Sequence, residues 1–334
     1  MKSYLYYPGC SLSGSARAYA ESLATLLEPL GIELHEIDDW NCCGATEYVT
    51  LSPLRGQALI SRNLALAEAQ RNGTQTLVAP CSACYVNLAK TDRYFRENPA
   101  FRDQLNEVLA VDGLHYTPGA VRVRHLLEVL LDDVGLDAIS AQVKRPLTGL
   151  RVAPYLGCLV SRPDLDRRWA EHEQPRALDR LMAALGAEVV DFSGRTACCG
   201  GHMTQISPET AWELLRRIVD AADRERADLL VTVCPMCQMN VDSYQGEMDR
   251  HFGTHYQVPI LFFTQLIGLA FGQPPKALGI GSEVVSAARA LSRVGVEVPP
   301  PAETEQPAPG GHEVKRPKRP KGLPMPEMPA EVSR

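Results

Sequence analysis

The chain has 334 residues, a formal net charge of −6 and 45% hydrophobic residues. This length suits one large or two ordinary globular domains, and the mildly acidic balance gives no sign of binding to nucleic acid. The first ten residues lack the apolar run of a signal peptide. The longest apolar stretch, residues 258–272, is shorter than the roughly 20 residues of a membrane span. We therefore expect a cytoplasmic protein with no membrane span and no nucleic-acid partner.

Strand and helix patterns alternate along the chain. In the first part, apolar or alternating runs predict strands at residues 4–7, 32–37 and 76–79. Helical periodicity predicts helices at 16–30 and 54–71 and a further helix after Cys84. In the second part, strands are predicted at 151–155, 188–191 and 229–233, and helices at 176–185 and 209–227. Apolar stretches at 123–134 and 258–272 are interpreted as two equivalent helices in the core or between the halves.

All ten cysteines belong to two copies of one pattern. Each copy has a single cysteine, then Cys-Cys-Gly, then Cys-x-x-Cys, and corresponding cysteines lie 148, 156 and 153 residues apart. The tetrapeptide Tyr-Pro-Gly-Cys at 7–10 returns as Tyr-Leu-Gly-Cys at 155–158. With the alternating elements, this duplication predicts an α/β fold of two tandem Rossmann-like parallel-sheet lobes related by a pseudo-twofold axis.

The duplication also sets the expected domain boundaries. The first cysteine-rich domain is predicted at residues 1–145 and the second at 146–295. Beyond them the chain becomes rich in proline, with a basic run at 315–321. Such a segment has too few apolar residues to form a core, so we predict a disordered Pro- and Lys-rich tail over 296–334.

Thiols clustered in this way point to metal ligation or redox chemistry, because a cytoplasmic chain of this size does not need disulfides to fold. Every cysteine group follows a predicted strand, and loops at the carboxyl ends of parallel strands meet at one edge of a sheet. Cys-x-x-Cys at the start of a helix directs two thiolates to one point, and the helix N-terminus lowers their pKa. Gly44 and Gly200, which end the two Cys-Cys-Gly motifs, let the backbone pass closely around a bound group.

The number of thiols bears on the kind of metal site. Adjacent cysteines on an extended backbone point apart, so each Cys-Cys pair would hold two irons or bracket a cluster rather than chelate one atom. Zinc takes four ligands and would leave one thiol over in each half. Cysteine thiolates are the usual ligands of iron–sulfur clusters. An iron–sulfur protein is therefore favoured over a structural zinc protein.

The full pattern is Cys-x(31)-Cys-Cys-Gly-x(36)-Cys-x-x-Cys followed by Cys-x(39)-Cys-Cys-Gly-x(33)-Cys-x-x-Cys. It resembles the tandem cysteine-rich "CCG" domains of the heterodisulfide reductase B-subunit family, over about residues 1–275, including Pro-Ile-Leu-Phe-Phe-Thr-Gln-Leu at 259–266. The resemblance implies a noncubane [4Fe-4S] cluster in each half, held by five cysteines. The first set is Cys10, Cys42, Cys43, Cys81 and Cys84. The second set is Cys158, Cys198, Cys199, Cys234 and Cys237.

The same resemblance implies a catalytic component of an oxidoreductase complex. In that family, one electron from each cluster splits a disulfide, or the reverse reaction oxidises thiols. The implied partners are a ferredoxin-like iron–sulfur protein (the C-type component) and a flavin-containing protein (the A-type component), with a thiol or disulfide substrate that a lipoate protein carries in some bacterial relatives. The chain has no G-x-G-x-x-G after a strand and no ferredoxin-type cysteine run, which agrees with electrons arriving from another polypeptide.

The alternative is an electron-relay component of a glycolate- or succinate-oxidising complex, which passes electrons to a quinone or carrier. An open, substrate-sized pocket beside both clusters would favour the catalytic function, whereas a cluster shielded by protein would favour the relay.

Residues near the cysteines have expected roles as well. His202 follows the second Cys-Cys-Gly and is the candidate catalytic proton donor. His35, on a strand, is expected to be structural. Thr46 and Glu47 are candidates to face a substrate pocket. Aromatic side chains expected to shield the clusters from water are Tyr7, Trp40 and Tyr155.

Two complete five-thiol sets predict about eight irons and eight sulfides per chain after anaerobic purification. Iron, zinc and acid-labile sulfide assays on the full chain check this. Stoichiometric zinc without sulfide would contradict the iron–sulfur assignment.

Overall fold

The computed structural model describes residues 1–45, 48–71, 73–162 and 175–298. It contains two four-stranded sheets in which every observed strand pairing is parallel. The first sheet has the order β2-β1-β3-β4, and its strands are β1 (Lys2–Tyr6), β2 (Ile32–Glu36), β3 (Thr76–Ala79) and β4 (Arg122–His125). The second has the order β6-β5-β7-β8, with β5 (Arg151–Tyr155), β6 (Glu188–Val189), β7 (Leu229–Thr232) and β8 (Ile260–Phe262). The predicted α/β class with two similar lobes is confirmed.

The helices repeat in the same order. The first half, from β1 onward, has α1 (Arg17–Leu27), α2 (Tyr48–Leu51), α3 (Pro53–Ala69), α4 (Ser82–Glu97), α5 (Pro99–Leu109), α6 (Leu126–Val129) and α7 (Leu136–Ala141). The second half, from β5 onward, has α8 (Gly157–Ser161), α9 (Ala177–Ala184), α10 (Met203–Ile206), α11 (Pro208–Arg224), α12 (Pro235–Phe252), α13 (Phe263–Ala270) and α14 (Ala288–Ser292). The starts of α3 and α11 match in detail, since each follows a serine and has proline at its first position.

Two predictions of secondary structure were wrong in part. The stretches 123–134 and 258–272, predicted as helices, each begin as the fourth strand of a sheet and only then become helical, as β4 with α6 and β8 with α13. A short apolar run fits a buried strand as well as a buried helix, so periodicity alone could not separate them. Side chains mark both transitions: His125 Nδ1 accepts a hydrogen bond from Leu127 N at 3.1 Å, and Gln265 Oε1 accepts one from Phe262 N at 2.8 Å.

Most other boundaries differ by one to three residues, and two of these differences concern the neighbourhood of the cysteines. The helix predicted after Cys84 begins at Ser82, so that Cys84 lies in the first turn of α4. The strand predicted at 188–191 is reduced to Glu188–Val189. Thr46, Glu47 and the predicted tail from residue 299 onward lie outside the described residues.

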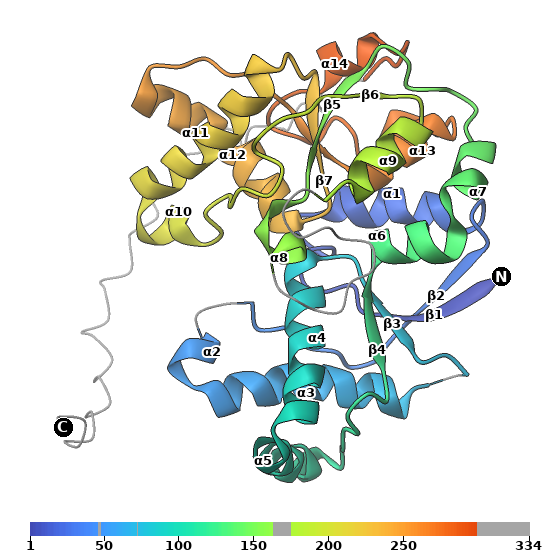
Figure 1. Cartoon of the computed structure of the whole chain (residues 1–334), viewed down its shortest axis with the longest axis vertical. Helices are drawn as coiled ribbons and strands as arrows, with labels where there is room; N and C mark the ends of the chain where they lie inside the picture. The colour runs from blue at the N-terminus through green and yellow to red at the C-terminus, as the bar shows by residue number, and fades with distance from the viewer. Residues whose placement is uncertain (46–47, 72, 163–174, 299–334) are drawn as a thin grey trace, which may run out of the picture. The chain divides into compact units, whose positions relative to one another are not determined.

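One apolar core joins the two halves, although their sheets are separate. In Figure 1, α1 from the first half lies beside α13 of the second half, and α13 in turn packs on α9. Tyr19 of α1 stacks on Phe262 with ring centroids 4.5 Å apart, and both side chains are buried. Close by, the hydroxyls of Ser22 and Thr264 form a buried hydrogen bond of 2.7 Å. The apolar segments after each cysteine motif therefore do pack in the core, as expected.

Among the described residues, no helix combines the length and the apolar composition that crossing a membrane would require.

Replacing Phe262 with alanine should lower the free energy of unfolding by about 3–5 kcal/mol, because a large buried ring at the contact between the halves is lost. Urea unfolding of the anaerobically purified protein measures this. The control Val111→Ala removes an exposed side chain and should change stability by less than about 0.5 kcal/mol. A comparable small effect for Phe262→Ala would contradict the described packing of α1 against the second half.

Candidate metal centres

The cysteines of each half lie at the carboxyl ends of three neighbouring strands. Cys10 follows β1, Cys42 and Cys43 follow β2, and Cys81 caps the N-terminus of α4 directly after β3. The second half repeats this arrangement: Cys158 lies in α8 after β5, the Cys-Cys pair follows β6, and Cys234 caps α12 after β7. The predicted placement after strands is therefore found in both halves.

In the first half, contacts between neighbouring thiols link all five cysteines. The sulfur atoms of Cys10 and Cys42 are 3.8 Å apart, about the 3.8 Å that separates two thiolates on one tetrahedral centre with bonds of about 2.3 Å. Side-chain hydrogen bonds with Cys42 and then Cys84 lower the pKa of Cys43 to about 4. Cys84 also contacts Cys81 and has its own pKa raised, first by its hydrogen bond with Cys43. The five thiols thus lie in one chain of contacts, and a metal that they bound would displace thiol protons.

In the second half, the thiols fall into a pair and a group of three. A hydrogen bond with Cys158 lowers the pKa of Cys198 to about 6. Hydrogen bonds with Cys237 lower the pKa of Cys199 and bring that of Cys234 to about 7. Within the described part of the chain, no three His, Cys, Asp or Glu side chains converge as ligands of a single metal ion would. The donor set is five soft thiols in each half, which suits iron–sulfur chemistry.

The glycine before each first cysteine leaves room for a thiol. At Gly157, whose φ is +71°, a Cβ would lie 2.8 Å from Cys237 Sγ, and at Gly9, whose φ is +72°, it would lie 2.7 Å from Cys84 Sγ. No side chain other than that of glycine fits both this backbone conformation and this contact. The glycine of the repeated Gly-Cys dipeptide therefore lets the sulfur of the last cysteine of the motif lie against the backbone that directly precedes the first.

The tyrosine two residues earlier fixes the Cys-Cys loop. Tyr7 Oη donates a hydrogen bond of 2.7 Å to the carbonyl of Asn41, and Tyr155 Oη donates one of 2.9 Å to the carbonyl of Ala197. Each acceptor directly precedes a Cys-Cys pair. Both tyrosines are fully buried, and Trp40 packs edge-on against Tyr7. Their predicted position beside the cysteines is confirmed, and they also anchor the loops.

Sequence reasoning missed a repeated asparagine. Asn87 Nδ2 donates to the Cys43 carbonyl at 2.9 Å, and Asn240 Nδ2 donates to the Gly201 carbonyl at 2.8 Å and lies 3.5 Å from Cys199 Sγ. Each asparagine stands three residues after the last cysteine, on the same face of its helix. The signal was present, because both motifs read Cys-x-x-Cys-x-x-Asn.

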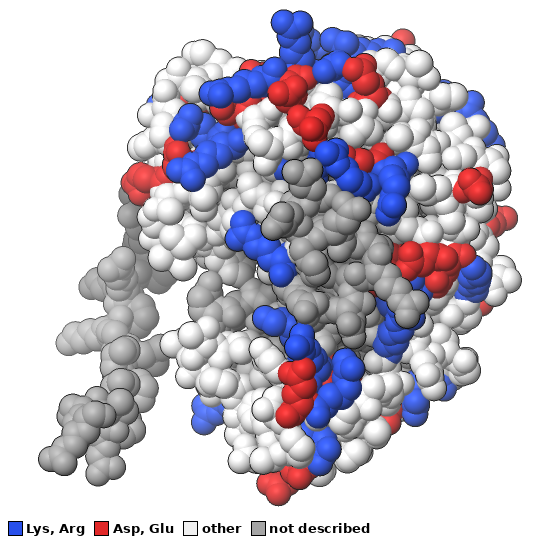
Figure 2. All heavy atoms as spheres, viewed as in Figure 1, with Lys and Arg blue, Asp and Glu red and all other residues white. Residues whose placement is uncertain are grey.

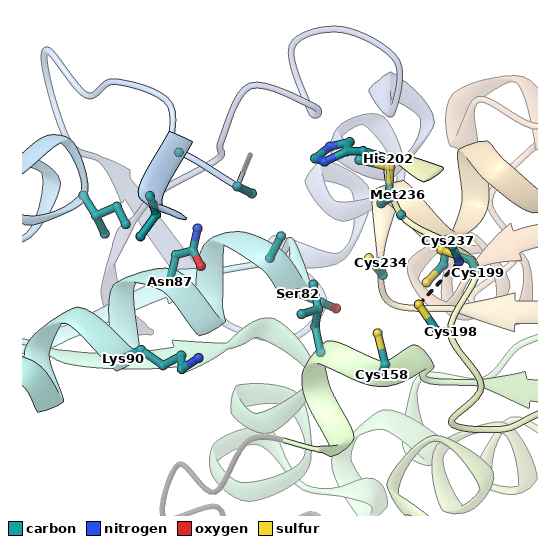
Figure 3. Close-up of a pocket in the computed structure, with 18 of the residues that line it drawn as sticks. Ser82, Asn87, Lys90, Cys158, Cys198, Cys199, His202, Cys234, Met236 and Cys237 are labelled. Atoms are coloured by element: carbon teal, nitrogen blue, oxygen red, sulfur yellow. Dashed lines mark hydrogen bonds between the residues drawn. The ribbon is translucent and has the colours of Figure 1, made fainter. Parts of the chain in front are cut away.

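A cavity of about 520 Å³ opens beside the second group of cysteines. All five second-half cysteines line it: Cys158 and the four cysteines of the second Cys-Cys-Gly and Cys-x-x-Cys motifs. Gly44 and Ala45 of the first Cys-Cys-Gly loop also line it. In Figure 3, Ser82, Asn87 and Lys90 of α4 stand opposite the cysteines of α8, α12 and the Cys-Cys-Gly loop. Both halves therefore build this cavity, but the cysteines among its described lining residues all come from the second half, so the expected pocket beside both clusters is found beside the second set only. Its apolar lining residues include Val49, Ile60, Leu156, Leu159 and Met236.

The cavity wall contains basic side chains as well as thiols. Among the described residues that line it, none is Asp or Glu, whereas Lys90 and His202 are present. The Arg162 guanidinium is also close enough to add to the lowering of the pKa of Cys198, which its hydrogen bond with Cys158 dominates. On the face shown in Figure 2, Lys and Arg side chains stand over α4 and α8 beside an uncharged hollow.

The remaining sequence-predicted residues have different outcomes. His202 lines the cavity at the start of α10, beside the second Cys-Cys-Gly. His35 Nε2 is hydrogen-bonded to Ser3 Oγ at 2.8 Å across β1 and β2, which agrees with a structural role. Thr46 and Glu47 are not among the described residues, but Ala45 and Val49 on either side of them line the cavity.

Comparison with known proteins identifies the family. The sequence model of the CCG cysteine-rich domain matches residues 4–89 and 152–242, one copy in each half. The chain belongs to the CCG-domain family that includes the heterodisulfide reductase B subunits. It is 35% identical to the 8-methylmenaquinol:fumarate reductase membrane anchor subunit of Wolinella succinogenes, over 86% of this chain and 99% of that one. It is 28% identical to the B subunit of the ferredoxin:CoB-CoM heterodisulfide reductase of Methanosarcina mazei, over 88% and 97%.

A solved structure shares the fold. A hypothetical protein from Helicobacter pylori aligns with a TM-score of 0.66 at 15% identity, over 85% of this chain. This chain spans about half of that protein's length, 52%.

Substituting Gly157→Ala should remove the second centre and leave the first, because the added Cβ meets Cys237 Sγ. We expect roughly half the iron of the unchanged protein, measured as iron and sulfide per chain. Gly113→Ala is the matched control: its φ is +70°, yet a Cβ there meets nothing within 4 Å, so it carries the same backbone strain of about 1–2 kcal/mol without touching a thiol. Full iron content in Gly157→Ala would contradict the proposed use of Cys237.

Proposed function

We propose that this chain is the catalytic iron–sulfur component of a heterodisulfide reductase-like complex, in which a disulfide is reduced or thiols are oxidised in the cavity beside the second-half cysteines. Family membership supports a role within an oxidoreductase complex, and the substrate-sized cavity between the Cys-Cys-Gly loops carries the proposal further. The two family matches fall within the proposed domains 1–145 and 146–295.

Each half supplies a complete ligand set for a noncubane [4Fe-4S] cluster, namely the five cysteines of each copy. When bound, such clusters supply electrons one at a time. The residues of the chain set the conditions for that exchange. Thiols at the cavity wall hold the redox group next to a substrate sulfur, and Val49, Ile60 and Met236 exclude water from the contact.

His202 is the proposed proton donor of the reaction. Reduction of a disulfide consumes two electrons and two protons and releases two thiols. The His202 imidazole lies in the cavity wall next to Cys199 and Gly200, where it can hold one of these protons for the departing sulfur. Lys90 on α4 stabilises an anionic group of the same substrate, because no carboxylate among the described lining residues opposes it.

The proposed partners follow from the electron balance. A ferredoxin-like iron–sulfur protein (the C-type component) and a flavin-containing protein (the A-type component) would deliver or accept electrons. A lipoate-carrying protein is a suitable source of the dithiol or disulfide. We propose a cytoplasmic site of action for this complex.

The second candidate is an electron relay to a quinone, as in complexes that oxidise glycolate or succinate. Two observations favour it: a relative of 35% identity is named as part of a methylmenaquinol:fumarate reductase, and much of the cavity wall is apolar. A quinone ring needs apolar walls but no anion-binding lysine, so charge separates the two candidates.

The test compares an anionic dithiol with its neutral form. Dihydrolipoate should change the electron paramagnetic resonance or visible spectrum of the anaerobic holoprotein at lower concentration than dihydrolipoamide does. Lys90→Gln should weaken dihydrolipoate binding about two- to fivefold, the effect of roughly 0.5–1 kcal/mol from one partly exposed charge, and leave dihydrolipoamide unchanged.

Lys276→Gln, in the 3₁₀ turn Pro275–Leu278, is the control and should alter neither titration. If neither thiol perturbs the spectrum while a water-soluble naphthoquinone does, the relay function replaces the catalytic one.

A further inference from the structure

Ser82 carries a buried hydroxyl that lacks a well-shaped hydrogen bond within the described part of the chain. The residue is the first of α4, between Cys81 and Cys84, and is 1% exposed. A buried hydroxyl left without an acceptor destabilises the folded chain. We therefore look for a hydrogen-bond acceptor next to the Ser82 hydroxyl.

The space beside this hydroxyl belongs to the second half. Ser82 lines the cavity together with the five second-half cysteines, and Figure 3 shows its side chain pointing toward them. Of these thiols, Cys234 has a described interaction with Ser82: hydrogen bonding with Cys237 chiefly, and with the Ser82 side chain to a smaller extent, lowers the pKa of Cys234. A residue from the first cysteine motif thus faces the metal site of the second.

The duplication shows that this serine is not needed for the Cys-x-x-Cys turn itself. The residue that follows Cys234, at the position of Ser82 in the repeat, is Pro235, which starts α12 without a side-chain donor. Proline is well suited to the first position of a helix, and α4 could begin in the same way. The hydroxyl is therefore a difference between the two centres rather than a shared structural requirement.

We propose that Ser82 is a positioning residue that donates a hydrogen bond to the sulfur at Cys234 of the second centre and makes that centre easier to reduce than the first. The proposal rests on the iron–sulfur function proposed above. Hydrogen bonds to cluster sulfurs stabilise the more negatively charged, reduced state and so raise the reduction potential. Because no counterpart hydroxyl stands at Pro235, the first centre lacks this contribution, and electrons are drawn toward the cavity.

The experiment is a redox titration of the anaerobic holoprotein, in which the spectrum of each centre is followed. Gly157→Ala, which retains only the first centre, assigns the two signals. In Ser82→Ala the potential of the second centre should move in the negative direction, and that of the first should stay constant. Loss of one hydrogen bond to a charged sulfur changes the equilibrium about tenfold, which is about 59 mV for a one-electron couple.

Two further variants serve as controls for the loss of the Ser82 hydroxyl. Ser82→Thr retains the hydroxyl and should keep a potential near that of the unchanged protein. Ser161→Ala removes an equally buried hydroxyl near Cys158, but this hydroxyl donates to the Gly157 carbonyl at 2.7 Å within α8, so no shift is expected. Equal potentials in Ser82→Ala and the unchanged protein, both with full iron content, would overturn the proposal, and so would an equal shift in Ser161→Ala.

Failure of the function proposed for the chain would look different. If the iron–sulfur assignment itself fails, the unchanged protein contains no iron–sulfur signal to titrate. If only the thiol or disulfide activity fails, as in the electron relay, both signals remain and the shift in Ser82→Ala is still expected. If Ser82→Ala does not retain the second centre, Ser82→Thr decides: a loss of that centre in both variants overturns the role of the hydroxyl, and its retention in Ser82→Thr alone supports it.

Discussion

The constraint on which both groups of cysteines depend is the contact between a buried thiol and the backbone of a glycine. Cys237 Sγ lies against Gly157, and Cys84 Sγ lies against Gly9, in each case where φ is positive and a Cβ would collide with the sulfur. This contact joins the loop after the first strand to the helix after the third. The remaining features of each centre are arranged around it, including the tyrosine that fixes the Cys-Cys loop and the asparagine that holds the carbonyls beyond it.

Parallel sheets make such a contact possible over long sequence separations. Cysteines more than 30 residues apart come together because each follows a strand of the same sheet and all strands end at the same edge. The cavity then arises between two such edges. First-half residues on α4 form one wall and second-half cysteines form the other, so the environment of one centre depends on side chains supplied by the opposite half.

Much of this arrangement could be predicted from the sequence, because it depends on spacing. The repeated cysteines, the strand before each of them and the packing of the apolar segments follow from periodicity and order. The strands at the start of residues 123–134 and 258–272 could not be predicted from the sequence. A short apolar run fits a buried strand and a buried helix equally well, and its composition does not show that a neighbouring strand of the sheet needs a pairing partner. The orientation of Ser82 toward the second half depends on how the halves pack, which no local pattern contains. Asn87 and Asn240 were within reach of the sequence, since their position in the repeat is identical.

The shared core has an evolutionary consequence. If the two repeats were separate identical protomers of a symmetric dimer, every substitution would appear in both copies, and a serine useful beside one site would be imposed on the other. Here the repeats belong to one chain, with Tyr19 of the first stacked on Phe262 of the second. Covalent linkage frees each copy to diverge at single positions while the packing keeps the copies together. The contrast between Ser82 and Pro235 is a difference that a symmetric dimer of one repeated chain could not have.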